Sequence, residues 1–224
     1  MDQWSGRIAR WSDLTLSVDV IGTGPWDERC YLIRRGGDAL VIDPGCPGEE
    51  IVAAVTMHDV TVQGIVATHG HFDHILGAAN ACRQFALPLH VSAADSHILR
   101  RANLHSFVTG WGQPVEDPVH LVDLDKLGPD ATIGVFAFRV HRTPGHTPGS
   151  RCLEIGDALF SGDTILARGL VDSGLPGADE DELRASARFL ASVVSRSVTM
   201  YPGHGDPCSF GDAFDRVGAE VVDG

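Results

Sequence analysis

One short stretch, His69-Gly70-His71-Phe72-Asp73-His74, carries three imidazoles and a carboxylate directly after an apolar run. That run, Gly64-Ile65-Val66-Ala67, favours a buried β-strand ending at Thr68, which places the cluster on the following loop. The first two histidines can then face one point, and the final Asp-His pair can face a second point beside it. Imidazole and carboxylate ligands suit zinc, iron or manganese. A polar helix start with Asp73 as N-cap is the alternative, but it leaves the three histidines unexplained.

The first half of the chain alternates between short apolar runs and helical patterns. A glycine turn joins two hairpin strands, and each later strand is followed by a segment with helical periodicity. This β-α-β-α order predicts a layered sheet with helices outside. The expected elements are strands at Cys30–Ile33, Ala39–Ile42, up to Thr68, and Pro88–Val91, with helices at Glu49–His58, about His74–Phe85, and Ala93–Arg101.

From Asn103 to Pro129 neither strand-like nor helical periodicity is evident. The segment is rich in Pro, Gly and Asp, with isolated aromatic residues, Phe107 and Trp111. Such a stretch is expected to be an irregular loop, and either a functional lid or a tolerated insertion would explain it. Regular patterns then resume. The expected strands are Thr132–Ile133, Val135–Phe136, Phe138–Val140, Cys152–Ile155, Ala158–Phe160 and Val198–Tyr201, with a helix at Asp179–Val194.

Three further ligand-type side chains follow strands in this second half. His146 lies in Thr-Pro-Gly-His-Thr-Pro-Gly, Asp163 in Ser-Gly-Asp-Thr, and His204 in Pro-Gly-His-Gly. Small residues flank each of them, which lets the backbone bend sharply and approach an ion closely. Any one could be an ordinary turn, but the recurrence favours completion of a metal site begun by the first cluster.

The remaining histidines are expected to be ordinary. His141 alone is a weak candidate for supporting a ligand, because it alternates along the strand ahead of the His146 turn. Arg151 and Arg168 lie beside ligand turns, and surface positions are expected for both. The other histidines are predicted on helices (His58, His97), in a strand (His90) or in irregular chain (His105, His120).

Composition narrows the class of protein. A length of 224 residues and an apolar share of 43% fit a single globular domain over residues 1–224. A formal charge of −13 argues against a nucleic-acid surface. Five scattered cysteines indicate reduced thiols, and neither a long apolar segment nor a secretion signal is evident, so a cytoplasmic location without membrane contact is expected.

Taken in order, these motifs resemble the metallo-β-lactamase superfamily, and within it the short bacterial glyoxalase II-like hydrolases. The resemblance covers about Cys30 to Pro207 and implies an αββα sandwich, two mixed β-sheets flanked by helices. It implies a first metal on His69, His71 and His146, a second on Asp73, His74 and His204, and a bridging Asp163. Two divalent ions, zinc first with iron or manganese as alternatives, would be the cofactors.

The implied chemistry is hydrolysis of a thioester with a small acyl group and a thiol carrier of unknown identity. Two ions about 3.5–4 Å apart would share a bridging hydroxide that attacks the carbonyl. Asp73 would act both as a ligand and as the orienting base. Aspartate at position 163, where zinc β-lactamases usually place cysteine or serine, argues against β-lactam hydrolysis.

One position departs from the glyoxalase II-like pattern. Those enzymes usually carry Lys or Arg nine residues after the bridging aspartate, to hold the thiol-derived part of the substrate. Here that position is Asp172, and an acid would repel an anionic glutathione arm.

Three other functions stay open. The same ligands serve lactone or carboxylic ester hydrolases, for which the Asn103–Pro129 segment could form an apolar pocket. A mononuclear iron persulfide dioxygenase would use His69, His146 and Asp163, although such relatives usually have Arg where Asp172 lies. A non-catalytic metal-binding module on the same fold is the third.

Overall fold

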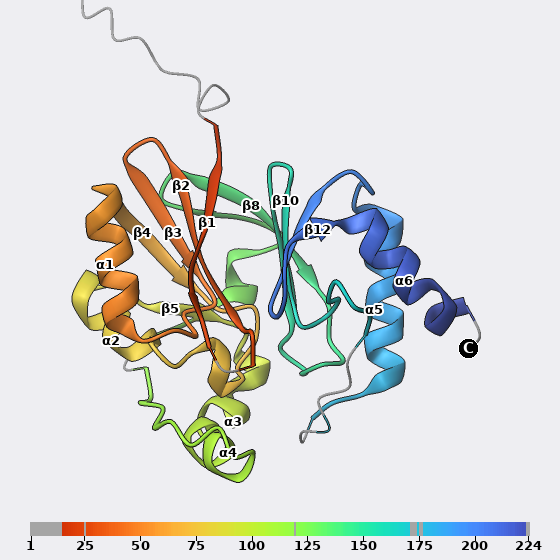
Figure 1. Cartoon of the computed structure of the whole chain (residues 1–224), viewed down its shortest axis with the longest axis horizontal. Coiled ribbons are helices and arrows are strands. Elements are labelled where there is room, and N and C mark those ends of the chain that lie inside the picture. The colour runs from red at the N-terminus through yellow and green to blue at the C-terminus, as the bar shows by residue number, and fades with distance from the viewer. Residues whose placement is uncertain (1–14, 25, 119, 171–173, 175–176, 223–224) are drawn as a thin grey trace, which may run out of the picture.

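Two six-stranded β-sheets pack face to face, with helices covering their outer surfaces (Figure 1). The computed structural model describes residues 15–222 apart from 25, 119, 171–173 and 175–176. The strand orders are β1-β2-β3-β4-β5-β6 and β12-β11-β10-β9-β8-β7. This is the predicted αββα arrangement of two mixed sheets, which is therefore confirmed.

The first sheet begins with antiparallel strands β1, β2 and β3 and continues with parallel strands β4, β5 and β6. Parallel neighbours need a crossover, which helices supply on the outer face. The strands are β1 (Ser17–Thr23), β2 (Arg29–Arg35), β3 (Asp38–Ile42), β4 (Thr61–Val66), β5 (Leu89–Val91) and β6 (Leu121–Asp123). The connecting helices are α1 (Gly48–His58), η2 (Phe72–His74), α2 (Ala78–Phe85), η3 (Ala93–Asp95), α3 (Ser96–Leu99) and α4 (Ala102–Val108), and η4 (Leu124–Leu127) follows β6.

The second sheet is antiparallel except for the pair β10 and β11. Helix α5 makes the crossover between these two strands, and Asp179 caps its first turn by accepting from the Glu182 N–H at 2.9 Å. The elements are β7 (Asp130–Ile133), β8 (Phe136–Arg142), β9 (Arg151–Ile155), β10 (Ala158–Gly162), α5 (Glu180–Val193), β11 (Thr199–Pro202), β12 (Cys208–Ser209) and α6 (Phe210–Val222). In the described part of the chain, no helix combines the length and apolar character needed to cross a bilayer.

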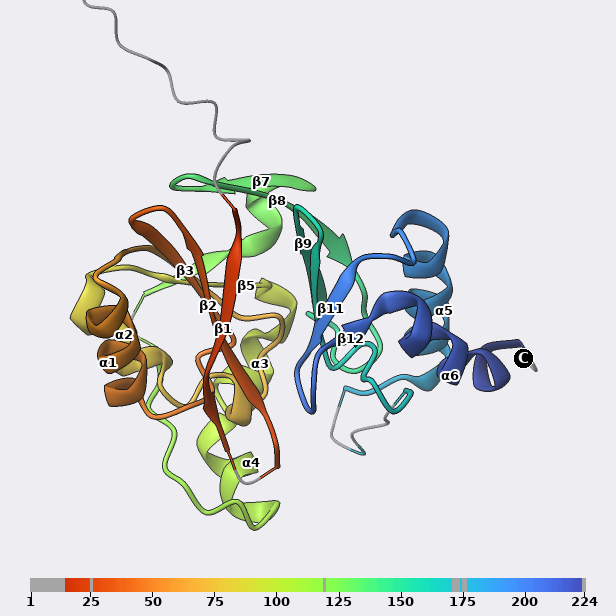
Figure 2. The ribbon, with the colours of Figure 1, turned by 45° about the horizontal axis from the view of Figure 1, so that its top comes forward.

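Alternation along the strands divides the buried apolar residues into three clusters. Between the sheets, Ile33 and Leu40 of the first sheet pack with Phe136 and Phe160 of the second. A second cluster fills the space between the first sheet and α1 and α2, and a third lies under α5 and α6. The two views agree on this four-layer order (Figures 1 and 2). The central strands β3, β9 and β10 therefore bury residues on both faces, whereas β7 and β8 alternate between buried and exposed positions.

Three expected elements differ from the sequence-based prediction. The helix expected from about His74 is instead the short η2 followed by a turn, because the Gly77 N–H donates to the Pro44 carbonyl at 2.8 Å, and α2 begins only at Ala78. The helix expected at Ala93–Arg101 is divided into η3 and α3. The segment expected to be irregular, Asn103–Pro129, contains most of α4 together with β6 and η4. Short elements such as β6 depend on pairing with β5 and carry little periodicity of their own.

An ion pair between a buried arginine and a partly buried aspartate joins the two sheets. Arg151, expected at the surface, is only 2% exposed at the start of β9. Its Nε and Nη2 donate to the two Asp125 carboxylate oxygens at 2.8 and 2.7 Å, and Nη2 also donates to Ser92 Oγ at 3.0 Å. Asp125 lies in η4 and Ser92 follows β5, so the guanidinium of the second sheet is held by elements of the first. Removing one partner would leave a buried charge unpaired.

We expect Asp125→Asn to lower the free energy of unfolding at pH 7 by about 3 kcal/mol, measured by denaturant titration. The Arg151 guanidinium lowers the pKa of Asp125 below the usual 3.8, so the carboxylate stabilises the fold above that value and loses this effect as the pH falls through the lower folded-state pKa. The difference between wild type and variant should therefore shrink below about pH 4. Asp130→Asn is the control, because Asp130 pairs with an exposed Arg139 and should cost under about 1 kcal/mol. Equal losses in the two variants would contradict this role for Asp125.

Candidate metal centre

The ligand-type residues all follow strands that end at one edge of the sandwich. The first cluster follows β4, and His146 lies in the turn between β8 and β9. Asp163 follows β10 and His204 follows β11. Because β10 and β11 are parallel, and β8 runs in the same direction as β10 across two antiparallel pairings, their carboxyl ends meet at the same edge. The topology thus gathers residues that lie far apart in the sequence.

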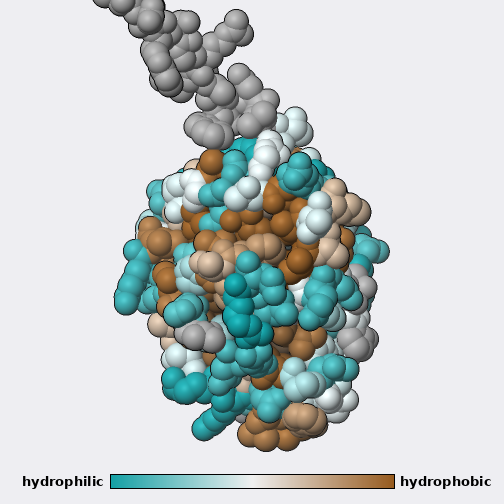
Figure 3. All heavy atoms as spheres, turned by 90° about the vertical axis from the view of Figure 1, so that its left-hand side faces the viewer, coloured by the Kyte–Doolittle hydropathy of each residue, from teal (hydrophilic) through white to brown (hydrophobic). Residues whose placement is uncertain are grey.

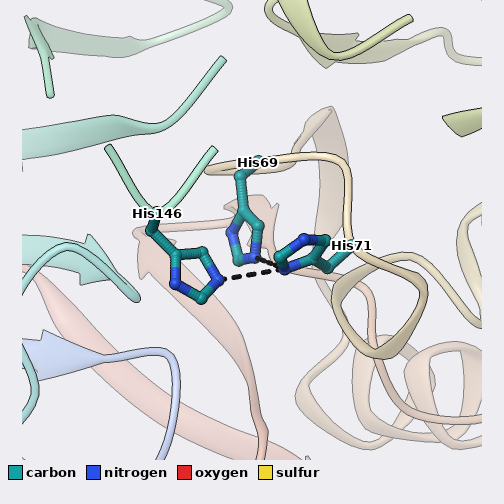
Figure 4. Close-up of side chains that lie close together, drawn as sticks. All are labelled: His69, His71 and His146. Atoms are coloured by element: carbon teal, nitrogen blue, oxygen red, sulfur yellow. Dashed lines mark hydrogen bonds between the residues drawn. The ribbon is translucent and has the colours of Figure 1, made fainter. Parts of the chain in front are cut away.

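Three imidazoles form the first group (Figure 4). His71 Nδ1 lies 3.1 Å from His69 Nε2 and 2.9 Å from His146 Nε2. All three rings are at most 4% exposed. These are the three residues that the sequence resemblance assigned to a first metal.

The second group consists of Asp73, His74 and His204. His204 Nε2 lies 3.4 Å from both Asp73 Oδ2 and His74 Nε2. Asp163 lies between the two groups, because its Oδ2 is 3.3 Å from both His146 Nε2 and His204 Nε2. Its Oδ1 is 3.5 Å from His74 Nε2. The seven residues therefore form one continuous cluster with a carboxylate in its middle.

A chain of hydrogen bonds orients the ring of His69. The carboxylate of Asp43 accepts from the Thr68 N–H at 2.7 Å and from the Thr68 hydroxyl at 2.9 Å. Because the hydroxyl donates its only hydrogen to Asp43, its oxygen accepts from His69 Nδ1–H, 3.1 Å away. The lone pair of His69 is then on Nε2, which faces the first group.

The rings of the second group are oriented in the same way. Asp43 accepts from His74 Nδ1 at 3.1 Å, and the Trp26 carbonyl accepts from His204 Nδ1 at 2.9 Å. Both Nε2 atoms therefore face the cluster. The sequence-based prediction missed Asp43, Thr68 and Trp26 as supports. An acid directly after β3, the parallel neighbour of β4, was the available signal for Asp43.

The chemistry of the donor set fits a bound cation. His71 Nδ1 faces two other ring nitrogens, and a single lone pair or N–H cannot satisfy both. The observed spacing is close to the roughly 3.3 Å between nitrogens that bind zinc tetrahedrally at about 2.0–2.1 Å. Burial lowers the pKa of His71 to about 3 and that of His69 well below its ordinary value, so both rings are neutral, which is the ligating form.

The electrostatics of the second group also favour positive charge. Burial opposes the charged form of His74, but Asp163, Asp73 and Asp43 outweigh it and raise the pKa of His74 well above its ordinary value. Asp163 has an oxygen, Oδ1, that is buried without a hydrogen-bond partner among the described residues. A cation between these groups would satisfy that oxygen and offset the carboxylate charge.

Other candidates lie elsewhere or outside the described residues. His141 points away from the cluster, since its Nε2 is 2.8 Å from Glu154 and its ring contacts Phe189 of α5. Its position on β8 faces the outer helix, which agrees with the expectation of an ordinary histidine and gives it no part in supporting a ligand. Asp172 lies outside the described residues.

Comparisons with known proteins agree with this geometry. A family model described as the metallo-beta-lactamase superfamily matches residues 23–204. A hydroxyacylglutathione hydrolase of Anaeromyxobacter dehalogenans is 31% identical over 181 residues, which cover 80% of this chain and 61% of that protein.

Two solved structures are similar over most of their length. The BLEG-1 B3 metallo-beta-lactamase has a TM-score of 0.80 at 27% identity, covering 89% of this chain and 97% of that one. The di-iron-bound form of TTHA1623 has a TM-score of 0.78 at 29% identity, covering 87% of this chain and 96% of that one.

We expect elemental analysis to find two metal ions per chain. His71→Ala and His204→Ala should each reduce this number to one, because each removes a ligand from a different group. Zinc added to chelator-treated protein should stabilise the fold by about 2.7 kcal/mol when free zinc exceeds its Kd a hundredfold. A wild-type protein that takes up a single ion, or two variants that keep both ions, would contradict the two-group assignment.

Proposed function

Because this chain belongs to the metallo-β-lactamase superfamily, we propose that it is a dinuclear metal-dependent hydrolase that cleaves a thioester. The observation that carries the proposal is the convergence of two ligand groups on one shared carboxylate, Asp163. The hydrolase name of the Anaeromyxobacter relative supports a thioester as the substrate class. We assign no particular thiol carrier, because Asp172 stands where glyoxalase II-like enzymes usually have the Lys or Arg that holds the thiol-derived part of the substrate.

The residues divide the work between binding and proton transfer. His69, His71 and His146 would hold one metal, Asp73, His74 and His204 the other, and Asp163 both. When bound, such ions stabilise an oxyanion and lower the pKa of bound water towards roughly 7. Zinc is the first candidate metal. Iron is the second candidate, because the similar protein TTHA1623 has a di-iron-bound form.

Asp73 is the proposed proton acceptor. Although burial opposes its charge, the neighbouring His74 lowers the pKa of Asp73, so its carboxylate is ionised at neutral pH. We assign Asp73 the proton of the attacking water. The water oxygen bonds to the carbonyl carbon, the carbon–sulfur bond breaks, and the thiolate takes the proton back. The products are a carboxylic acid and a thiol.

Three aromatic side chains lie in contact beside the cluster, and they favour a substrate that carries an apolar group. Phe72, which lies between two ligand residues in the sequence, contacts Trp26 and Trp111 edge-on or tilted, each with ring centroids 5.4 Å apart. Trp26 is 41% exposed, and its carbonyl accepts from the ligand His204. Its side chain can therefore contact a substrate that reaches the metals.

Helix α4 extends this apolar surface. It packs against η2, which carries Asp73 and His74, and it exposes Leu104, Phe107 and Val108. Hydrophobic atoms gather at the lower end of the molecule in Figure 3, at the height where Figure 1 shows α4. This surface also suits acyl lactones and carboxylic esters, which are the second candidate substrates on the same site.

The second ligand group separates the proposal from a mononuclear iron persulfide dioxygenase. That enzyme would need only His69, His146 and Asp163, which would leave the geometry of Asp73 and His204 unexplained. A non-catalytic metal-binding module would not explain the exposed apolar surface beside the cluster. The likeness to BLEG-1 makes β-lactam hydrolysis a rival that has to be measured.

We expect the zinc- or manganese-loaded protein to hydrolyse short-chain acyl thioesters faster than the metal alone. His71→Ala and Asp73→Asn should each lower kcat/KM at least about a hundredfold, because one loses a ligand and the other the proton acceptor. Acyl lactones, carboxylic esters and nitrocefin assayed in parallel rank the substrate classes, and oxygen uptake by iron-loaded protein measures the dioxygenase. The proposal would be contradicted if the protein hydrolysed thioesters no faster than free metal does, or if both variants hydrolysed them as fast as wild type.

Trp26→Ala should raise KM for long-chain acyl substrates about fivefold to thirtyfold while leaving kcat nearly unchanged. The substitution removes the exposed ring, worth roughly 1–2 kcal/mol of contact, and keeps the backbone carbonyl that orients His204. Phe189→Ala is the control, because Phe189 is similarly exposed (43%) on α5 and contacts His141, which points away from the metal cluster. A loss in kcat with KM unchanged would contradict a substrate-binding role.

A further inference from the structure

We propose that Asp95 is a positioning residue that fixes the distance between His146 and the pair His69 and His71. It would thereby determine the metal affinity of the first group and leave that of the second group unchanged. This inference rests on the metal centre proposed above and adds to it a residue that is not a ligand.

The carboxylate of Asp95 bonds to both ligand loops at once. Its Oδ2 accepts from the Gly70 N–H and from the Thr147 hydroxyl, each at 2.8 Å, and its Oδ1 accepts from the Gly149 N–H at 2.6 Å. Gly70 lies between His69 and His71, and Thr147 directly follows His146. The side chain is fully buried, so these bonds form away from competing water.

Asp95 holds two loops that belong to different sheets. It ends η3, which follows β5 of the first sheet, and the His69 loop follows the neighbouring strand β4. The His146 turn joins β8 to β9 in the second sheet. The first ligand group therefore takes two imidazoles from one sheet and one from the other, with a single carboxylate across the junction.

The backbone is shaped for this close approach. A Cβ atom added at Gly149 would lie 2.3 Å from Asp95 Cγ, and one added at Gly70 would lie 2.9 Å from Asp95 Cβ. Any other residue at either position would push Asp95 away from a loop. Gly70 of His-Gly-His and Gly149 of the His146 turn thus have a shared explanation in packing against Asp95.

The carboxylate of Asp95 matches this set of partners. All three are donors, and a carboxylate is an acceptor at both oxygens. An asparagine at this position would direct its NH₂ either at the Gly149 N–H or at the Gly70 and Thr147 donors. A buried donor left facing a donor is unfavourable, and the two loops would relieve this contact by moving apart.

The second ligand group depends on a different acid. Asp43 orients His74 and also holds Thr68, which orients His69. His204 is oriented by a backbone carbonyl. Loss of Asp95 bonds therefore acts on the position of His146 relative to His71, not on the rings of the second group.

The test measures metal binding rather than turnover. Chelator-treated wild type, Asp95→Asn and Asp123→Asn are titrated with zinc against a chromophoric chelator, and with cobalt while its visible absorption is recorded. Asp123 is the matched control: its Oδ1 accepts from the Ala93 and Asp125 N–H groups at 3.1 and 3.2 Å, so it supports turns near Asp95 without holding a ligand loop.

We expect Asp95→Asn to weaken one of the two metal-binding steps roughly tenfold to a hundredfold and to change the cobalt spectrum of that step only. Asp123→Asn should match wild type. Thr147→Val, which removes one donor and keeps the shape of the side chain, should weaken the same step less, and its effect should disappear in the Asp95→Asn background. Thr147→Val alone still gives an answer if Asp95→Asn does not fold by circular dichroism.

The outcomes separate this inference from the function on which it rests. Wild type that binds two ions, together with Asp95→Asn and Thr147→Val variants that bind both as tightly, overturns the positioning role and leaves the metal centre standing. Equal weakening of both steps in Asp95→Asn also overturns it, because that result indicates a general loss of structure. A wild-type protein that binds no metal overturns the centre and this inference together.

Discussion

The burial of seven ligand-type side chains, six fully and His204 in large part, at one edge of an apolar sandwich is the constraint on which the rest of this structure depends. Imidazoles and carboxylates removed from water are costly unless each has a partner of suitable charge or geometry. Three other carboxylates bond to groups around the cluster: Asp43 to the ring of His74, Asp95 to the Gly149 N–H of the turn that carries His146, and Asp125 to Arg151. They follow β3, β5 and β6. Strands β3 and β5 flank β4, which carries the first ligand cluster, and β6 pairs with β5.

Each of these acids has a distinct partner across the structure. Asp43 orients ligand rings, Asp95 joins the two ligand loops, and Asp125 binds the buried Arg151 of the second sheet. Ser92 links the last two systems, because its hydroxyl lies against Arg151 and its carbonyl accepts from the Asp95 N–H. The metal centre and the contact between the sheets are therefore supported by one connected set of polar groups.

The sequence indicated the architecture and the ligand set through three kinds of signal. Apolar runs with helical patterns between them predicted a layered sheet with helices outside, and clustered histidines after a strand indicated a metal site. The resemblance to the metallo-β-lactamase superfamily implied the two mixed sheets and the assignment of ligands to two metals. The shorter elements were not predicted, because β6 and η3 have three residues each and depend on their neighbours for pairing and capping. The acids that support the ligands were not predicted either, for a related reason. Asp43 and Asp95 each resemble an acid in an ordinary turn until their partners are known.

The sequence by itself determined which side chains were available for a metal and which strands they follow, because local periodicity and turn residues are encoded within a few positions. Tertiary structure decided which of them meet. The pairing of β10 with β11, and of β8 with β9, brings His146, Asp163 and His204 to the loop after β4. It also buried Arg151, against expectation, and turned His141 outwards. Those outcomes depend on strand order and sheet packing, which no short segment of the chain encodes.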